Sequence, residues 1–540
     1  MMRYEAGPRE LRMPSYARFI SISHAWETRE HPDPCRYQLQ QIVEWAVLYE
    51  AAFRADVWIF YDYVSLFQYE RDPKSEQRSF DEAMANMHIL YAHEFSLTFR
   101  IETLTPDEVW EAMKENEQEL VTVWDDESKS LKAKPLNKLM HNRVFYLERG
   151  WCKAEVEWSS LRTVNAQHQR IDGRDSKGSD GDAFNGRVPM TPQAFQESMN
   201  QAEFTHRSDK DAVIHLQEKI FFEKVTSCET LVLEGLPATQ IEALARAMPL
   251  YENLKHLKIN KFSCGEGEAQ LFAEALAKTT VLEKFEVHNG EEESGKHLVK
   301  ALAEALKVNS SIANIGLAAN SIGDEGAKAA RVPAPVSAQE ALAAALKVNS
   351  SIVNLDLKHN RIGKKGAKAL AEVLKVNSSI TNINLEHNNI SAEGAKAVAE
   401  ALKVNASIAN INLEHNYIGD AGAKAWRAFA EALKVNTSIV NMNLVQNGIG
   451  EEGAKAWRLL ASVAACGTMS HRANFFHVRG GWLNILEKLN DIVDFFSSSK
   501  SCFREQFVCL SSVSSFMKTH EADLNNIRHS RPLKGSKYQP

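Results

Sequence analysis

The sequence predicts an α/β protein in two parts, a parallel-sheet domain at the N-terminus followed by a solenoid of stacked strand–helix units. Three observations lead to this prediction. Over residues 16–160 short apolar strands alternate with helical stretches, as in a parallel α/β sheet. In the second half the string LKVNxSI occurs five times, and such repetition is typical of stacked units. Each copy leads into a short strand of alternating apolar and polar residues, which gives the sheet two different faces.

The N-terminal domain is expected to contain an open parallel sheet. Its strands are predicted within RFISISHAW, DVWIFYDYVSLFQ, FSLTFRI and RVFYL, and its helices within residues 37–53, residues 80–95 and the stretch that begins at Gly150. Residues 101–140 form a charged insertion. In an open sheet, ligands bind beyond the carboxyl ends of the strands, and the helix after Gly150 begins near such an end.

Four motifs of this domain resemble the TIR/HET group of domains. They are Ser23–Trp26, Trp58–Ile59 with Asp62 and Gln68, Met87–Ala92, and Arg149–Glu155. The last, W-C-x-x-E, is similar to the plant TIR motif that carries the glutamate used in NAD cleavage. The resemblance implies Glu155 as a catalytic residue and NAD as a substrate, with no bound cofactor, and the rings of Trp26 and Trp151 would bind that substrate. WIFYD departs from the HET pattern W-I-D because its aspartate is displaced.

A glutamate suits this chemistry because breaking the bond between nicotinamide and ribose builds positive charge on the sugar. A carboxylate held in a partly dry cleft can stabilise that charge. A structural role is the alternative: Trp151 and Cys152 would anchor a helix in the core, and Glu155 would lie on its surface one turn later. The domain would then signal or assemble, with self-association through this domain, and would not be an enzyme.

Each position of the repeated unit has a physical reason. Leu357, Leu385 and Leu413 are each 28 residues apart. In NINL the apolar residues Ile383 and Leu385 would point inward, and the asparagines would point outward. Asn388 lies where the chain must turn, and a buried amide there can satisfy the backbone groups of the turn. One unit cannot bury its own apolar side, so the units must stack.

Two spacings depart from 28 residues, one through an insertion at 331–340 that contains two prolines and one within AWRAFAEAL. Weaker copies upstream, TLVLEGL, HLKINKF and KFEVHNG, extend the series, so about eight units are predicted over residues 229–465. These repeats resemble the ribonuclease-inhibitor type of leucine-rich repeat, which is shared by Nod-like receptors and the activating proteins of the Ran GTPase. The resemblance implies an α/β horseshoe with parallel strands on its concave side, and it leaves the ligand open.

The outward strand positions form the candidate binding site. A ladder of amides and carboxylates suits hydrogen bonding to a polar or basic protein surface, and a solvated face copied by duplication is the alternative. His359, His387 and His415 occupy equivalent positions and are also expected to be products of duplication. The predicted protein-binding residues are Asn354, Asp356, Lys358, Asn382, Asn384, Glu386, Asn410, Asn412, Glu414, Asn441 and Asn443.

The remaining segments and the composition complete the prediction. Residues 161–228 are expected to form a flexible loop and a helical linker that caps the solenoid, and residues 466–540 a helical cap with a polar tail. A net charge of -7 gives no reason to expect nucleic acid as a partner, and no apolar run is long enough for a membrane span. Seven scattered cysteines without paired or metal-site spacing predict reduced thiols, no metal site and a cytoplasmic location.

We therefore expect a cytoplasmic recognition and signalling protein whose solenoid binds a protein partner on its concave face. Two other functions stay open. One is an enzyme whose N-terminal domain cleaves NAD, and the other is a GTPase-activating scaffold similar to the Ran-activating proteins. The sequence contains no Gly-rich phosphate loop of the Walker type, and its repeats contain no identifiable catalytic arginine.

Overall fold

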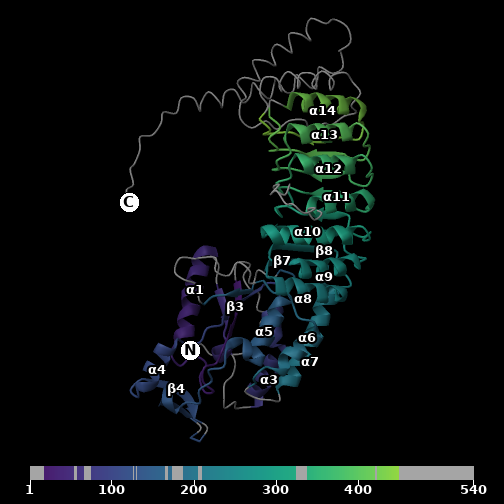
Figure 1. Cartoon of the computed structure of the whole chain (residues 1–540). Helices are drawn as coiled ribbons and strands as arrows, with labels where there is room; N and C mark the ends of the chain where they lie inside the picture. Colours follow the sequence, from purple (N-terminus) through teal and green to yellow (C-terminus); the bar gives the residue numbers. More distant parts are fainter. Residues whose placement is uncertain are drawn as a thin grey trace, which may run out of the picture. The chain divides into compact units, whose positions relative to one another are not determined.

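The computed structural model describes residues 18–53, 57–65, 74–125, 127–128, 130–164, 168–172, 186–204, 209–323, 337–419 and 422–448. These residues form a mixed α/β structure with two parallel sheets and one antiparallel hairpin (Figure 1). No helix among them is long and apolar enough to cross a membrane. The predicted loop at 165–187 and the insertion at 331–340 lie largely outside the described residues, and segments 449–465 and 466–540 lie outside them entirely.

The N-terminal sheet has four parallel strands in the order β2-β1-β3-β6. The strands are β1 (Arg18–His24), β2 (Val57–Phe60), β3 (Ser96–Ile101) and β6 (His168–Arg170). The helices of this region include α1 (Tyr37–Phe53), α2 (Asp62–Ser65), α3 (Lys74–Ala92) and α5 (Gly150–Ser160). The predicted parallel sheet is therefore present, with its first three strands where the sequence indicates them.

The fourth predicted strand, RVFYL at residues 143–147, is wrong. This segment forms no strand and ends in a short 3₁₀ helix, η2 (Tyr146–Glu148). The physical reason is that a side chain, and not a neighbouring strand, engages its backbone. The guanidinium group of Arg149 donates to the carbonyl oxygens of Asn142 and Val144, both at 2.8 Å. The fourth place in the sheet, beside β3, belongs to β6 instead.

The charged insertion at 101–140 folds into a small unit with its own core. Its elements are α4 (Asp107–Glu115) and an antiparallel hairpin of β4 (Leu120–Asp125) and β5 (Ser130–Pro135). Trp110 of α4 packs with Val121 and Val123 of β4 in an apolar cluster separate from the core of the sheet. The insertion therefore adds a structural unit and leaves the parallel sheet uninterrupted.

In the described part of the repeat region, eight parallel strands form one sheet in chain order, β7 to β14. The strands are β7 (Thr230–Leu236), β8 (His256–Phe262), β9 (Lys284–Gly290), β10 (Asn314–Gly316), β11 (Asn354–Asp356), β12 (Asn382–Asn384), β13 (Asn410–Asn412) and β14 (Asn441–Asn443). The helices between them are α8 (Ala238–Ala247), α9 (Glu266–Ala277), α10 (Glu292–Leu306), α11 (Ala338–Val348), α12 (Lys364–Leu374), α13 (Ser391–Leu402) and α14 (Ala423–Val435). These helices stack one beside the next in chain order (Figure 1), as a solenoid requires.

The repeated leucines form the predicted apolar column. Leu357, Leu385 and Leu413 are fully buried, and Ile383 also points into the core. Asn388 is buried in the turn after β12, where its side chain bonds to backbone groups as predicted. The inward and outward assignments made from strand alternation are therefore confirmed for this unit.

Two helices join the N-terminal region to the first repeat, α6 (Pro192–Asn200) and α7 (Asp209–Ser227). Ile220 and Phe221 of α7 belong to the apolar core that also contains Leu231 and Leu233 of β7. Trp158 of α5 belongs to the same core. The apolar interior of the repeats therefore continues through α7 onto α5.

Candidate functional site

The outward side chains of the repeat strands lie in three columns, which together we call the sheet face. Strand register places the first column, the amide ladder, side by side; its members are Asn314, Asn354, Asn382, Asn410 and Asn441. In each pair the side-chain N–H of one asparagine donates to the side-chain oxygen of the preceding one. The ladder is therefore fixed by its own hydrogen bonds as well as by the sheet.

The second column consists of Asp356, Asn384, Asn412 and Asn443, and its side-chain oxygens accept from backbone N–H groups. The oxygen of Asn384 accepts from the backbone N–H of Glu386 at 3.1 Å, and that of Asn412 accepts from the N–H of Glu414 at 3.0 Å. The amide N–H groups then reach the third column. Asn412 donates to the Glu386 carboxylate at 3.1 Å, and Asn443 donates to the Glu414 carboxylate at 2.9 Å. The second column thus positions the carboxylates of the third.

The third column, which consists of Lys358, Glu386 and Glu414, carries charge. The ammonium group of Lys358 lies 2.7 Å from the Glu386 carboxylate. Partial burial alone would raise the pKa of Glu386, but the hydrogen bond and charge of Lys358 outweigh this effect and the pKa is lowered. The carboxylate is therefore ionised at neutral pH. The columns border a groove of about 460 Å³ that extends over strands β9 to β14.

All the predicted binding residues lie on or beside this groove. Lys358, Glu386 and Glu414 stand beside it, and the other eight line it. The groove also contains residues that sequence analysis missed, Asn314 of β10 and Lys284 and Glu286 of β9. The signal for them was present, because KFEVHNG and NIGLAAN hold the strand positions that NINLEHN holds in later repeats.

In the N-terminal domain, Glu155 of α5 is buried and does not lie on the surface of its helix. Only 8% of the surface of Glu155 is exposed to solvent. The hydroxyl of Ser23 donates to the Glu155 carboxylate at 2.5 Å. Burial raises the pKa of Glu155 to about 8; the hydrogen bond from Ser23 opposes this shift and the charge of Asp62 adds to it. The carboxyl group therefore holds its proton at neutral pH.

Asp62 brings two residues of the first motif together at the carboxyl end of β1. The Nε2 atom of His24 lies 2.8 Å from one carboxylate oxygen of Asp62, and the indole N–H of Trp26 donates to the other at 2.9 Å. Burial alone would lower the pKa of His24, but the charge and hydrogen bond of Asp62 outweigh burial and the pKa is raised. The aspartate that is displaced in WIFYD therefore contacts the first motif, because α2 begins at this residue.

Trp151 lies apart from this cluster. Its indole N–H donates to Asp209 of α7 at 3.1 Å, and its ring packs edge-on against Trp158 with centroids 6.3 Å apart. The structure thus brings Glu155 and Trp26 to the same end of β1 and places Trp151 against α7. Across the described part of the chain, no group of three or more His, Cys, Asp or Glu residues could hold a metal ion.

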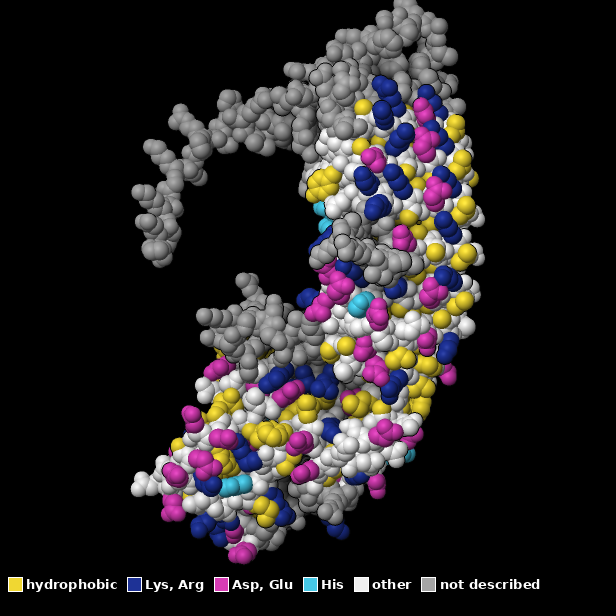
Figure 2. All heavy atoms as spheres, viewed as in Figure 1, with side chains coloured by type: hydrophobic (Ala, Val, Ile, Leu, Met, Phe, Trp, Pro, Cys, Tyr) yellow, Lys and Arg dark blue, Asp and Glu magenta, His cyan; other side chains and the backbone are white. Residues whose placement is uncertain are grey.

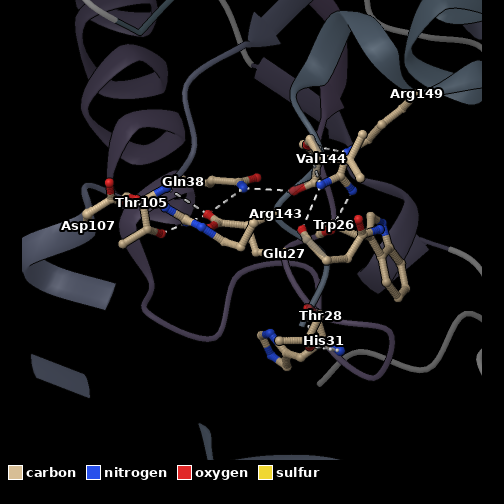
Figure 3. Close-up of polar contacts among 12 residues, drawn as sticks. Trp26, Glu27, Thr28, His31, Gln38, Thr105, Asp107, Arg143, Val144 and Arg149 are labelled. Atoms are coloured by element: carbon tan, nitrogen blue, oxygen red, sulfur yellow. Dashed lines mark hydrogen bonds and ion pairs between the residues drawn. The ribbon is translucent and has the colours of Figure 1, made fainter. Parts of the chain in front are cut away.

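A buried ionic network fixes the segment that follows β1 (Figure 3). Glu27 is fully buried and forms an ion pair with Arg143. It also accepts from the backbone N–H of Thr105 at 2.9 Å and from the side-chain amide of Gln38 at 3.1 Å. The network therefore holds Trp26, the preceding residue, in position. Sequence analysis missed Glu27 and Arg143 because they are 116 residues apart and no local pattern links them.

Comparisons with known proteins identify part of the repeat region. A family model described as Leucine Rich repeat matches residues 348–371 and 376–399, and no curated protein matches the chain. Among solved structures, one similar chain is Leiomodin-1 Actin-Binding Site 2, with 22% sequence identity, coverage of 29% of this chain and 79% of that chain, and a TM-score of 0.21. The segments matched by the family model contain β11, most of α12, β12 and most of α13, so these units of the eight-stranded sheet are leucine-rich repeats.

Proposed function

We propose that this chain is a protein-binding scaffold that holds its partner on the sheet face. One observation supports the proposal most strongly: the polar columns are fixed by hydrogen bonds between neighbouring strands and border an open groove. Side chains that are already fixed lose little conformational entropy when a partner binds, so more of the contact energy appears as affinity.

The amide ladder has hydrogen-bonding capacity left for a partner. An asparagine side chain has two N–H donors and an oxygen with two lone pairs. In Asn354 and Asn410 the ladder uses one donor and one lone pair of each amide. The second donor and lone pair of each can therefore bond to a polar protein surface in the groove.

The charges beside the ladder favour a basic partner. Asp356, Glu386 and Glu414 carry three negative charges, and Lys358 supplies one positive charge. Charge-assisted hydrogen bonds are stronger than neutral ones, and complementary charge steers the correct partner to the surface. We therefore expect lysine or arginine side chains of the partner to contact these carboxylates.

The test compares two double variants of the full chain with the same change in charge. Glu386→Lys/Glu414→Lys reverses charge on the sheet face, and Glu372→Lys/Glu400→Lys reverses it on the helices, where acidic and basic side chains are interspersed (Figure 2). A photo-crosslinking residue at Asn384 captures the partner for identification by mass spectrometry. We expect only the sheet-face variant to lose the crosslinked partner. Equal capture by both variants would reject the sheet face as the binding site.

For the N-terminal domain we propose assembly or signalling through self-association. The proposal is supported by exposed apolar side chains along α1, namely Leu39, Val43 and Val47. With residues of β2 and β4 they border a hollow of about 800 Å³. Exposed apolar side chains clustered on one surface often mark sites of protein contact.

Light scattering of the full chain over a range of concentrations tests this role. We expect the mass to rise with concentration in the native chain and to stay monomeric in Val43→Lys/Val47→Lys. Val404→Lys changes an exposed valine of the repeats and serves as the control. A native chain that is monomeric at every concentration would reject self-association.

Cleavage of NAD is a second candidate function, favoured by the convergence of Glu155, His24, Asp62 and Trp26 at the carboxyl end of β1. Parallel sheets bind ligands at this end of their strands. A substrate would have to displace the hydroxyl of Ser23 from the Glu155 carboxyl group before that group could face the sugar.

Nicotinamide release by the full chain tests this candidate, both free and clustered on a surface. Glu155→Gln should abolish release. Glu157→Gln is the matched control, since Glu157 is a second buried carboxyl of the same helix and accepts from the backbone N–H of Met190. No release by the native chain, or equal release by Glu155→Gln, would reject the enzyme.

A further inference from the structure

Three histidines form an additional column at the carboxyl ends of the strands, beside the sheet face. The rings of His359, His387 and His415 are stacked, with centroids 4.3 and 4.0 Å apart and planes inclined by 18° and 16°. All three residues have positive φ, and the backbone N–H of each donates to a carbonyl oxygen of the next repeat. The backbone therefore fixes this histidine column.

Charged groups of the sheet face lie beside the histidine column. The Nε2 atom of His387 lies 3.6 Å from Glu386, which binds Lys358. Glu414 holds the position equivalent to Glu386 in the next repeat, and Asp356 lies at the end of β11. When the histidines are neutral, these three carboxylates and the one ammonium group have a net charge of -2. Three protons added to the histidines would change this net charge to +1.

The stacked neighbours oppose protonation of the central ring, His387. The pKa of His387 is lowered by burial and by His415 and His359 on either side, and the neighbouring carboxylate opposes the shift. Each proton therefore disfavours the next, because like charges in contact repel one another. The guanidinium group of Arg361, which follows His359 by two residues in the sequence, pairs with the carboxylate of Glu292 at 3.3 Å.

We propose that the sheet face binds a basic protein surface at neutral pH and releases it when the histidine column is protonated. This inference rests on the proposed function and adds to it the chemistry of the partner and a condition for release. Histidine is the side chain whose charge changes between about pH 5 and 8. Added positive charge beside Glu386 and Glu414 repels the same basic groups that these carboxylates attract.

Neighbouring repeats indicate that the backbone does not require histidine at these positions. Gln446 and Ala319 are the equivalent residues of the adjacent repeats, with φ of 56° and 58°. Glutamine is therefore a residue that this fold already accepts in the same conformation. The matched variant of the column is His359→Gln/His387→Gln/His415→Gln.

The first measurement needs no partner. Histidine side-chain NMR signals of the full chain are titrated with acid and assigned from single glutamine variants. We expect His387 to titrate at lower pH in the native chain than in His359→Gln/His415→Gln, where its two neighbours no longer carry charge. An unchanged midpoint would overturn the inference, because the rings would then titrate independently.

The second measurement uses a fluorescent lysine-rich peptide as a basic probe, with anisotropy recorded at constant ionic strength. Binding to the full chain should weaken at least about tenfold between about pH 7.5 and about pH 5.5, because several like charges lie within a few ångströms of one another. The triple glutamine variant should bind equally at both values. A pH response that is absent from the native chain, or that persists in the triple variant, would overturn the inference.

The charge-reversed variants separate this failure from failure of the proposed function. At neutral pH Glu386→Lys/Glu414→Lys should lose the peptide, and Glu372→Lys/Glu400→Lys should keep it. If the sheet-face variant binds as well as the native chain, the proposed binding face is wrong and the inference falls with it. If that variant loses the peptide but native binding does not respond to pH, only the inference is overturned.

Discussion

Asn388 allows a direct test of how the repeats are held together. Its side-chain oxygen accepts from the backbone N–H groups of Asn360 and Ile362 at 3.0 and 2.9 Å. Its amide donates to the carbonyl oxygens of Leu357 and Leu385, both at 3.0 Å. The amide also donates to the carbonyl oxygen of Glu386 at 3.2 Å. One buried side chain thus joins two neighbouring repeats, and the change Asn388→Ala removes all five bonds.

The expected loss of stability follows from the groups that are left behind. The two N–H groups lose their acceptor in a buried turn, and a buried polar group without a partner costs about 1–3 kcal/mol. The carbonyl oxygen of Leu385 keeps a second donor, Asn416, at 2.8 Å and contributes less. We therefore expect Asn388→Ala to lower the free energy of unfolding by about 3–5 kcal/mol.

Urea denaturation followed by circular dichroism measures this change. Repeat proteins can unfold in more than one step, so hydrogen exchange of the segment containing Asn360 and Ile362 supplies a local readout and should become faster. The control is Asn389→Ala, an exposed neighbour, which should change stability by less than about 0.5 kcal/mol. A cost for Asn388→Ala no greater than that of the control would refute the reasoning.

Three further changes test other parts of the structure. Leu385→Ala removes a fully buried side chain and should cost about 2–5 kcal/mol in the same assay; a cost near zero would place this leucine outside the core. Arg143→Met leaves the buried Glu27 without its cation and should cost about 3–5 kcal/mol, part of which the additional change Glu27→Gln should restore. The pKa of Glu155 is raised from 4.5 to about 8, so the native state binds its proton more tightly and stability falls as pH rises through this range. Glu155→Gln should reduce that fall, measured as the difference in urea midpoint between about pH 5 and about pH 8, and an unchanged fall would contradict the burial argument.

The repeat region could be predicted because its signals are local. A strand, a turn and a helix all fall within 28 residues, and five near-identical copies agree on the inward leucine and the turn asparagine. Alternation along a strand then decides which side chains face the core and which form the columns. The hydrogen bonds between the columns were not predictable, because they depend on the register of neighbouring strands.

The N-terminal domain depends on contacts between residues far apart in the sequence. No local pattern places β6 beside β3, and residues 143–147 are rich in apolar and aromatic residues like a strand although Arg149 engages the backbone there. Asp62 looked like a departure from its motif. It reaches His24 only because α2 begins at the end of β2.

Under the proposed function, selection of a partner would depend on the positions where the repeats differ. The amide ladder bonds within itself, and the second column bonds to the backbone and to the third column, so both make the face rigid without marking one part of it. Gly316 breaks the second column, and a Cβ there would lie 3.1 Å from the side chain of Glu286. Lys358 stands where the next repeats carry Glu386 and Glu414. A partner can therefore distinguish the β9–β11 part of the face by charge and by space. Charge reversals would report mainly on recognition, whereas substitutions in the amide ladder would change recognition and the stability of the sheet together.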